Sequence, residues 1–358
     1  MSRPSFAHID TLAFVANYRY AKSLAPSSRA AAVIKANAYG HGAVVLARAL
    51  AAEADAFAVA ATEEAMELRE SGIDRPIVLL EGPFEPKEIE NAARHGFALV
   101  IHSPIQVDWL LAAKPERPLQ VWLKIDTGMH RLGLPPDELQ AAHARLRASS
   151  NVAEIILMSH FARADETGEA ATDRQLRLFR NATRRLQGGT SLANSAAILA
   201  WPETHGDWVR PGIMLYGSSP LHKGHPAGVP LQPVMRLESE LIAIHELSAG
   251  EAIGYGARYT CSEPTRVGTV AMGYADGYPR HAPDGTPVAV NGRMTHLIGR
   301  VSMDMLTVNL NDQPDARVGD RVQLWGNLVN ANEVARLSDT ISYELFTGIT
   351  RRVHFNYH

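Results

Sequence analysis

Polar side chains that could carry chemistry follow eight short apolar runs in the first part of the chain. They are Lys35, Thr62, Glu81, His102, Asp126, His160, Ser195 and Arg210. Among these residue types, lysine offers a nucleophilic amine, histidine and carboxylates transfer protons, and serine and arginine donate hydrogen bonds to anions. Because the rim of a sheet or barrel needs polar residues in any case, we interpret Thr62, Glu81 and His102 as solvated ends or helix caps.

Lys35 has the sequence context best suited to covalent chemistry. It ends the apolar run RAAAVI (29–34), where burial disfavours a charged ammonium group. A neutral amine can attack an aldehyde and form a Schiff base. The following segment, ANAYGHG (36–42), has two glycines that let the backbone approach a ligand closely. A purely structural lysine at a strand end is the alternative.

Composition points to a folded enzyme-sized protein. The chain has 358 residues, is 46% hydrophobic and has a net charge of -3, which excludes disorder and gives no basic surface for nucleic acid or anionic membranes. Its one cysteine, Cys261, excludes an intramolecular disulfide and a cysteine-ligated metal cluster. We see no signal peptide and no membrane-spanning run, and therefore expect a soluble, cytoplasmic protein.

Apolar runs alternate with amphipathic segments from residue 29 to about residue 216, as in repeated βα units. The predicted strands are 30–34, 56–60, 76–80, 98–101, 119–125, 153–158, 190–194 and 207–210. Eight such strands predict an α/β fold with an N-terminal (β/α)8 TIM barrel. A doubly wound open sheet is the alternative, but no G-x-G-x-x-G follows any of the strands.

The sequence pattern changes after about residue 230, where short segments rich in β-branched residues are separated by turn residues. The pair Asn291-Gly292 predicts a hairpin, and 329–339 predicts a helix capped by Asn330 or Asn332. We therefore expect a barrel domain over 1–230 and a mostly antiparallel C-terminal β-domain over 231–358, with 231–234 as a hinge.

The string AVIKANAYGHG (32–42) resembles the cofactor-lysine motif of the alanine racemase family, whose members use pyridoxal 5′-phosphate (PLP). Seven further segments resemble family motifs in matching order: LKIDTGMHRLG (123–133), MSHFARADE (158–166), ANSAA (193–197), VRPGIMLYG (209–217), IGYGARYT (253–260), GYADGYPR (273–280) and GRVSMDM (299–305). The resemblance covers essentially the whole chain, and eight ordered motifs are far more specific than any one of them.

This resemblance implies roles for individual residues. Lys35 would bind PLP as a Schiff base and act as the base on the D-side, and Tyr255 would be the base on the L-side. Arg131 would contact the phenolic oxygen of PLP and steer the substrate carboxylate, to which the Met303 backbone would donate. Taken without the family motif, Tyr255 is a turn residue between glycines, Arg131 a solvated loop residue and Met303 a core side chain.

The resemblance also implies a set of cofactor-binding residues: Tyr39, Ser195, Gly212 and Ile213 at the phosphate, Arg210 at the pyridine nitrogen, and His160 beside Arg210. An N-cap role is the alternative for Ser195, and a rim salt bridge the alternative for Arg210. His160 with Arg210 is the candidate source of the positive charge that a tyrosine base requires.

Arg210 would explain the type of reaction. Since arginine is a hydrogen-bond donor but a very poor proton donor, it would leave the pyridine unprotonated and a weak electron sink. Negative charge at the substrate Cα would then be short-lived. Two acid–base groups on opposite faces would be required to invert the stereocentre, and Lys35 and Tyr255 fit those positions.

Lys124 shares one face of its predicted strand with Trp122 and Asp126, because side chains alternate along a strand. In many family members the corresponding lysine is carbamylated, which converts a cation into an anion that orients Arg131. A plain ion pair between Lys124 and Asp126 is the alternative.

One departure concerns a tyrosine near the C-terminus that contacts the phosphate in some relatives. Arg351 stands at the matching place here, which puts that contact and the width of the entry channel in doubt. His354 and His358 have metal-like spacing, but we interpret them as a terminal tail and expect no metal site.

The resemblance implies a homodimer with shared sites that racemises alanine, either to supply D-alanine for the cell wall or to catabolise it. A broader or serine racemase, a PLP-binding protein without catalysis and an amino-acid decarboxylase are the alternatives. The second domain with Tyr255 and Met303 argues against the second alternative, and the context of Cys261 argues against the third.

Overall fold

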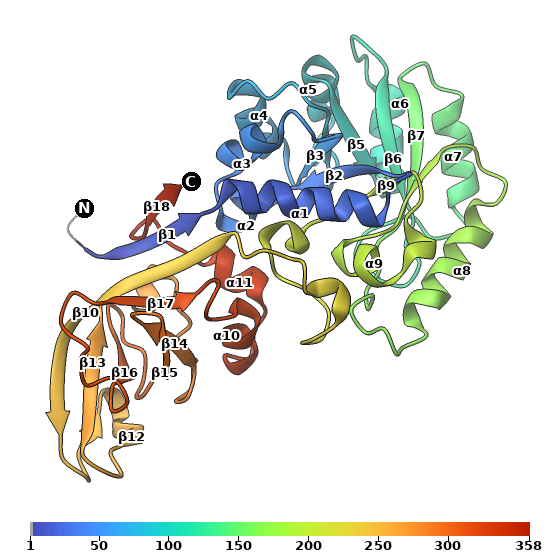
Figure 1. Ribbon diagram of the computed structural model, residues 1–358. Helices are drawn as coiled ribbons and strands as arrows, with labels where there is room; N and C mark the ends of the chain where they lie inside the picture. Colours follow the sequence, from blue (N-terminus) through green and yellow to red (C-terminus); the bar gives the residue numbers. More distant parts are fainter. Residues whose placement is uncertain (1–2) are drawn as a thin grey trace. The chain divides into compact units, whose positions relative to one another are not determined.

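The computed structural model describes residues 3–358, which form two compact units. The barrel unit comprises residues 15–215 and 219–231. The sheet unit comprises the N-terminal segment through Phe14, residues 216–218 and residues 232–358. Figure 1 labels most of the helices and strands of both units. The division into domains at residues 230 and 231 stays a prediction.

The barrel unit is built on eight parallel strands that close on themselves. These are β2 (Arg29–Val33), β3 (Ala56–Val59), β4 (Ile77–Leu79), β5 (Phe97–Ile101), β6 (Leu119–Lys124), β7 (Val152–Met158), β8 (Gly189–Ser191) and β9 (Trp208–Val209). Strand β9 pairs with β2 and closes the ring. Because both faces of such strands are covered, their sequences are apolar runs. The predicted (β/α)8 barrel is confirmed.

Helices follow most of these strands. The helices and 3₁₀ turns before residue 232 are α1 (Thr11–Leu24), α2 (Lys35–Gly40), α3 (Ala43–Leu50), α4 (Thr62–Glu70), α5 (Lys87–His95), α6 (Pro104–Ala112), α7 (Leu139–Arg147), α8 (Ala171–Thr183), α9 (Ser195–Ala200), η1 (Pro202–Thr204), η2 (Ile213–Tyr216) and η3 (Pro226–Gly228). Helix α5 is typical: Ile89, Ala92 and Ala93 are buried at helical spacing, and Gly96 ends it at φ 70°.

Large side chains fill the barrel toward the amino ends of its strands. The Trp122 and Trp208 rings are buried, with their centroids 5.4 Å apart. The Arg29 guanidinium lies over the Trp208 ring, 4.2 Å from its centroid, a favourable cation–π arrangement. Gln120 accepts a hydrogen bond from the Trp122 indole at 2.9 Å. Gln120, Trp122 and Lys124 therefore lie on one face of β6.

The sheet unit is mostly antiparallel, as predicted. Its strands are β1 (Ser5–Ile9), β10 (Met235–Leu247), β11 (Ala252–Ile253), β12 (Tyr259–Thr260), β13 (Thr265–Val270), β14 (Pro287–Val290), β15 (Arg293–His296), β16 (Leu306–Asn309), β17 (Arg321–Trp325) and β18 (His354–Tyr357). The main sheet has the order β15-β14-β17-β10-β1-β18, with β13 and β16 extending from the far end of β10. Its helical elements are η4 (Tyr255–Ala257), η5 (Tyr274–Asp276), α10 (Ala331–Leu337) and α11 (Ser342–Thr347).

The first and the last strand of the described chain belong to this sheet. Strand β1 pairs antiparallel with β10 and parallel with β18. The prediction of a terminal tail at His354 and His358 is therefore wrong: His354 begins β18, and the ring of His358 lies 3.2 Å from that of His8, from Nε2 to Nδ1. The backbone partners of the C-terminal segment lie more than 300 residues away in sequence, beyond the reach of a local pattern.

Two local predictions in the sheet unit are confirmed. Asn291 (φ 48°) and Gly292 (φ 79°) form the turn between β14 and β15, as a type I′ hairpin requires. Asn330 caps α10, and its side chain accepts a hydrogen bond from the Asn332 backbone at 2.8 Å. Within residues 3–358, no helix is long and apolar enough to cross a membrane.

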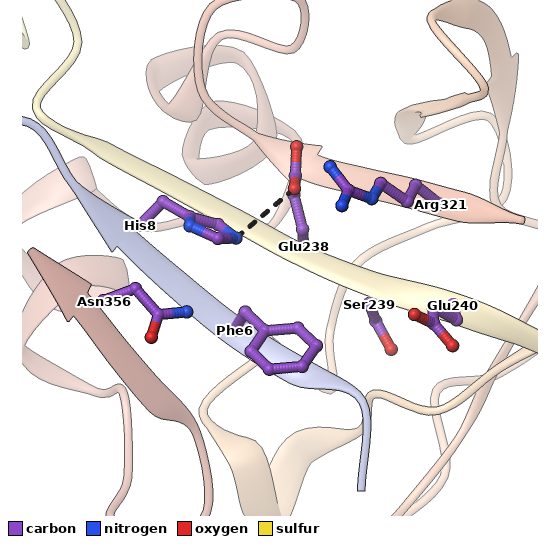
Figure 2. A pocket seen from close by; sticks show the side chains of 7 residues that line it. All are labelled: Phe6, His8, Glu238, Ser239, Glu240, Arg321 and Asn356. Carbon is purple, nitrogen blue, oxygen red and sulfur yellow. Dashed lines mark ion pairs between the residues drawn. The ribbon is translucent and has the colours of Figure 1, made fainter. Parts of the chain in front are cut away.

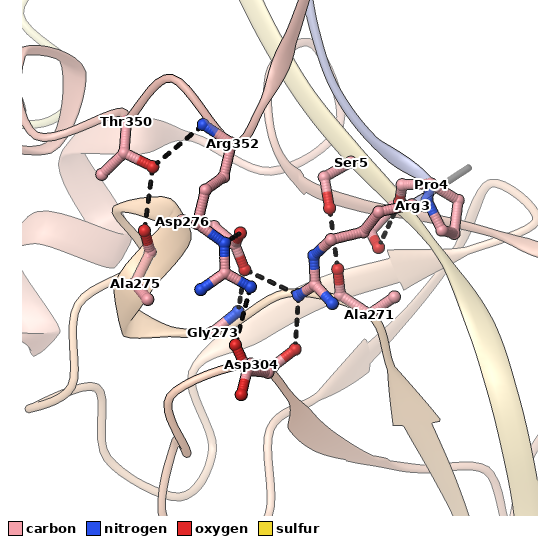
Figure 3. A network of polar contacts seen from close by, with 11 residues as sticks. Arg3, Pro4, Ser5, Ala271, Gly273, Ala275, Asp276, Asp304, Thr350 and Arg352 are labelled. Carbon is pink, nitrogen blue, oxygen red and sulfur yellow. Dashed lines mark hydrogen bonds and ion pairs between the residues drawn. The ribbon is translucent and has the colours of Figure 1, made fainter. Parts of the chain in front are cut away.

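A buried carboxylate joins distant parts of the sheet unit (Figure 3). Asp276, which is 0% exposed, accepts hydrogen bonds from Arg3 and from the Gly273 backbone, each at 2.8 Å. Arg352 Nε lies 3.2 Å from its second oxygen. Arg352 also pairs with the Asp304 carboxylate at 2.6 Å, and Arg3 donates to the Asp304 carbonyl at 2.5 Å. The N-terminal segment is thus fixed to the loops around 273 and 304.

We expect Asp276→Ala to lower the free energy of unfolding by about 2–3 kcal/mol, because Arg3 and one backbone N–H lose a buried acceptor and Arg352 loses an ion-pair partner. Asp304→Ala is the matched control. Its carboxylate is 45% exposed, and such a pair contributes about 0–1 kcal/mol. Urea unfolding of both variants measures the difference, and equal losses would contradict the importance of burial.

Candidate active site

The backbone immediately after Lys35 is left-handed. Ala36, Asn37, Ala38 and Tyr39 have φ values between 48° and 53°, and none of them is glycine. The label α2 therefore covers a left-handed turn, a conformation that costs an L-residue about 1–2 kcal/mol each. Such strain persists only where the surroundings hold it, and it is concentrated at functional sites. The sequence predicted bending here, but through the glycines rather than through these four residues.

Four cationic side chains at or after the carboxyl ends of the strands influence one another electrostatically; they are Lys35, Lys124, Arg131 and Arg210. Burial, followed by the charges of Arg210, Arg131 and Lys35, lowers the pKa of Lys124 to about 8. Lys124 is 6% exposed, and its amine meets no carboxylate at ion-pair distance among residues 3–358. The predicted alternative, an ion pair with Asp126, is thus wrong. This positive region is suited to anions such as phosphates and carboxylates.

Asp126 instead shapes the loop that carries Arg131. Its Oδ1 accepts hydrogen bonds from the backbones of Gly128, Met129 and His130 at 2.9–3.1 Å. Its Oδ2 lies 3.1 Å from the His130 ring. Backbone hydrogen bonds to Gly128 and His130 help to lower the pKa of Asp126, against the opposing effect of burial. The exposed Arg131 therefore sits in an ordered loop after β6.

Arg210 is a buried cation whose partners are all neutral. It follows β9, is 4% exposed and meets no carboxylate at ion-pair distance in the described part of the chain. Its acceptors are Ser191 Oγ (2.6 Å), the carbonyls of Ser159 (2.8 Å) and Leu192 (3.1 Å), and His160 Nδ1 (3.3 Å). Burial lowers the pKa of Arg210 to about 9, so it stays charged at neutral pH. The alternative of a rim salt bridge is wrong.

His160 accepts from Arg210 and therefore has Nδ1 unprotonated. Burial, and then the charge of Arg210, lower the pKa of His160 well below its usual value. The imidazole is consequently neutral, with its hydrogen on Nε2. The expectation that His160 itself contributes positive charge is corrected: at this pair the charge lies on Arg210.

The four residues predicted at a phosphate come together in the barrel unit. Ser195 Oγ accepts hydrogen bonds from the Gly212 and Met214 backbones at 2.8 and 3.3 Å, which leaves its own hydroxyl hydrogen to donate. A Cβ at Gly212 would lie 2.8 Å from the Tyr39 hydroxyl oxygen. Burial raises the pKa of Tyr39, so its phenol is a donor at neutral pH. Ile213 directly follows Gly212 and begins η2.

The N-cap of α9 is Asn194, whose side chain accepts from the Ala197 backbone at 3.1 Å. The alternative of a capping role for Ser195 is therefore wrong. The hydroxyl groups of Tyr39 and Ser195 thus lie beside Gly212, where a Cβ would crowd the Tyr39 oxygen, and such a set suits an anionic group such as a phosphate.

Tyr255 and Met303 belong to the sheet unit. Tyr255 is 69% exposed and is flanked by Gly254 (φ 68°) and Gly256 (φ 72°). Met303 is 52% exposed, so its alternative as a core side chain is wrong. The Met303 carbonyl accepts from Ala275 at 3.0 Å, whereas its N–H donates to no group in residues 3–358. The segment thus presents a free backbone donor.

Two residues near the site were missed by the sequence analysis. Glu64 accepts hydrogen bonds from the Ala36 and Ala60 backbones at 2.6 and 2.7 Å. Gln175 donates to the His160 carbonyl at 3.0 Å and accepts from the Ala162 backbone at 2.9 Å. The acidic first turn of α4 was a signal for Glu64, but the sequence contained none for Gln175.

A separate pocket lies on the sheet unit and contains none of the predicted site residues (Figure 2). Its lining consists of Phe6, His8, Glu238, Ser239, Glu240, Arg321 and Asn356. His8 Nε2 and Glu238 Oε2 are 3.6 Å apart. Across residues 3–358, no group of three or more His, Cys, Asp or Glu side chains could hold a metal ion.

Known proteins resemble this chain throughout its length. The family models of the alanine racemase N-terminal and C-terminal domains match residues 9–220 and 234–357. An alanine racemase of Azoarcus sp. is 56% identical over 99% of both chains, and a catabolic alanine racemase of Pseudomonas aeruginosa is 54% identical over 98% of both. A solved biosynthetic alanine racemase from Pseudomonas aeruginosa has a TM-score of 0.97, at 51% identity and 99% coverage of both chains.

The lowered pKa of Lys124 makes stability depend on pH. An unfolded lysine titrates near 10.4, whereas Lys124 in the folded protein has a pKa of about 8. Between these values the unfolded chain binds an extra proton, so the free energy of unfolding rises with pH. We expect Lys124→Met to stabilise the protein at pH 7 by about 3 kcal/mol and to lose this advantage by about pH 10.

Urea unfolding in carbonate-free buffer at several pH values tests this expectation. Lys114→Met, at an exposed position of the barrel unit, is the control and should show no comparable change. An advantage of Lys124→Met that stays constant from pH 7 to pH 10 would contradict the shifted titration of Lys124.

Proposed function

The chain belongs to the alanine racemase family, and we propose that it interconverts L-alanine and D-alanine, with PLP as cofactor and Lys35 and Tyr255 as its two bases. The observation that carries the mechanism is the buried Arg210, which is bonded only to neutral groups. This arrangement supports a role for Arg210 as a hydrogen-bond donor that stays protonated beside the cofactor.

The donor set of the barrel unit fits PLP. When bound, PLP supplies an aldehyde that condenses with amines and a ring that withdraws electrons from the substrate Cα. Tyr39 and Ser195 would donate to its phosphate, with Gly212 and Ile213 alongside. Arg210 would donate to the pyridine nitrogen, and His160 accepts from Arg210 and so helps to orient it.

Two bases follow from the charge on Arg210. A guanidinium does not transfer a proton to the ring nitrogen, so negative charge at the substrate Cα is poorly stabilised. The Cα must therefore be reprotonated quickly. Lys35 would remove or return the proton on the D-side and Tyr255 on the L-side.

The substrate carboxylate would be held by Arg131 and by the Met303 N–H. The lowered pKa of Lys124 supports its carbamylation, because a neutral amine reacts with carbon dioxide. A carbamate there would offset the crowded positive charge and would orient Arg131. Arg351 is exposed, and its effect on a phosphate contact stays a prediction.

We include a homodimer in this proposal. Tyr255 and Met303 are both exposed on the sheet unit, and in a two-fold dimer each protomer would use them to complete the site of its partner. A cytoplasmic location is also part of the proposal, because Cys261 is unpaired and buried, as suits a reducing compartment. The relatives include catabolic and biosynthetic enzymes, so production of D-alanine for the cell wall and its catabolism both accord with the family.

Lys35→Ala should abolish the covalent attachment of PLP, because no other amine replaces Lys35 at the end of β2. We expect loss of the long-wavelength absorption of the holoenzyme and no PLP-modified peptide after borohydride reduction. Lys22→Ala is the control, since Lys22 pairs with Asp55 at 2.7 Å within the same unit. A reduced adduct that persists in Lys35→Ala would remove Lys35 from its role.

Tyr255→Phe should slow turnover of L-alanine by about 10²–10⁴-fold, the usual contribution of a general base. Removal of the α-hydrogen of D-alanine should be retained, because Lys35 performs it. Exchange of the α-hydrogen with D2O, followed separately from each enantiomer, measures both steps. Tyr274→Phe, another exposed tyrosine of the sheet unit, is the control. Unchanged turnover from L-alanine in Tyr255→Phe would contradict the two-base assignment.

A further inference from the structure

We infer that Glu64 is a positioning residue for Lys35, through two hydrogen bonds that hold the left-handed turn after Lys35 in place. This inference rests on the proposed function, because it takes Lys35 as the lysine that binds PLP. Glu64 belongs to none of the motifs that carry the family resemblance, and it does not touch the Lys35 side chain through any contact found in residues 3–358.

The turn requires something to hold it. Its residues from Ala36 to Tyr39 all have φ near 50°, a region that side chains with a Cβ avoid. Four such residues in succession would relax toward the right-handed region if their hydrogen bonds were lost. The turn is fixed at its far end, where the Asn37 side chain accepts from Ala43 at 2.8 Å and the Asn37 carbonyl accepts from Gly42 at 2.9 Å.

Glu64 fixes the near end. It lies in the first turn of α4, and its Oε1 accepts from the Ala36 N–H at 2.6 Å. Its Oε2 accepts from the Ala60 N–H, just after β3, at 2.7 Å. Since β2 and β3 are neighbouring parallel strands, one carboxylate ties their carboxyl ends together. Both bonds are charge-assisted, and such bonds are about twice as strong as neutral ones.

The hydrogen bond at Ala36 acts directly on Lys35. The Ala36 N–H belongs to the peptide unit that also contains the Lys35 carbonyl, and this unit is planar. Holding the direction of the N–H therefore restricts ψ of Lys35 and, with it, the direction in which the Lys35 side chain leaves the backbone. Without the carboxylate, the peptide plane can rotate and the amine loses its position relative to the cofactor-binding residues.

A simple helix-capping role is the competing explanation. Glu64 is the third residue of α4, and its bond to Ala60 resembles that of a capping box. A cap alone would affect stability and leave Lys35 untouched. Glu63 separates the two explanations: it lies in the same first turn, is exposed and makes no hydrogen bond or ion pair within residues 3–358.

The test compares Glu64→Ala, Glu64→Gln and the control Glu63→Ala as purified holoenzymes. We measure the dissociation constant of PLP, the long-wavelength absorption of the Lys35–PLP bond and its dependence on pH, and alanine turnover. Glu64→Ala should raise the dissociation constant about tenfold, shift the pH dependence and slow turnover about 10- to 100-fold, as expected for a misplaced reacting group. Glu64→Gln, which keeps one acceptor, should lie between, and Glu63→Ala should match the wild type.

A second substitution tests the cause. Ala36→Gly gives the turn a residue that adopts positive φ without strain, and it should partly restore PLP affinity and the absorption of Glu64→Ala. If Glu64→Ala folds poorly, Glu64→Gln is compared with the double variant Glu64→Gln/Ala36→Gly, so that the test stays decisive.

Wild-type affinity and absorption in Glu64→Ala and Glu64→Gln, with only the melting temperature lowered, would overturn the inference in favour of a cap. Failure of Ala36→Gly to restore any PLP affinity would overturn it as well. If the proposed function itself were wrong, the wild-type protein would show no Lys35–PLP bond, a result that does not depend on any Glu64 variant.

Discussion

A guanidinium enclosed without a counter-ion is the constraint on which the candidate site depends. Removing a charge from water costs several kcal/mol unless dipoles replace the lost hydration. The barrel provides these dipoles for Arg210 from the ends of β7 and β8: a hydroxyl, two carbonyls and one imidazole nitrogen. None of these acceptors is a carboxylate, so no negatively charged group competes with a bound ring for the Arg210 guanidinium.

The neighbouring groups adapt to this charge. Burial, and then the charge of Arg210, lower the pKa of His160 and keep its ring neutral. The same two causes come first for the lowered pKa of Lys124. A carboxylate near Arg210 would offset its charge and so remove its part of both shifts, while the part due to burial would stay. Electron withdrawal from a bound pyridine would also be stronger if the pyridine faced an acid, and acid–base groups on opposite faces would be less necessary. The proposed two-base chemistry thus depends on the absence of a carboxylate beside Arg210 in the described structure.

The sequence predicted the barrel well because its strands are buried on both faces, so that their apolar runs stand out between helices. It also predicted which polar residues follow these strands, because each residue is found by reading to the end of an apolar run. It failed where the partners are distant: β1 and β18 pair across more than 300 residues, and no pattern around His354 indicated this. It also failed at Ala36 to Tyr39, because left-handed backbone was expected only of glycine. The alternative of an ion pair between Lys124 and Asp126 failed because β6 ends at Lys124 and the Asp126 carboxylate accepts from the backbone of its own loop instead.

Three strained or electrostatically costly features of the barrel unit lie near one end of the barrel. The left-handed turn, the enclosed Arg210 and the partly neutralised Lys124 all follow the carboxyl ends of strands. Further toward the amino ends, the Trp122 and Trp208 rings pack together and Arg29 makes a favourable cation–π contact with Trp208. In a barrel, each strand runs from one end to the other. Stabilising contacts at the amino ends of the strands can therefore offset unfavourable geometry at their carboxyl ends. Local rules of propensity and charge pairing therefore fail where this protein is proposed to act, and hold where it only has to fold.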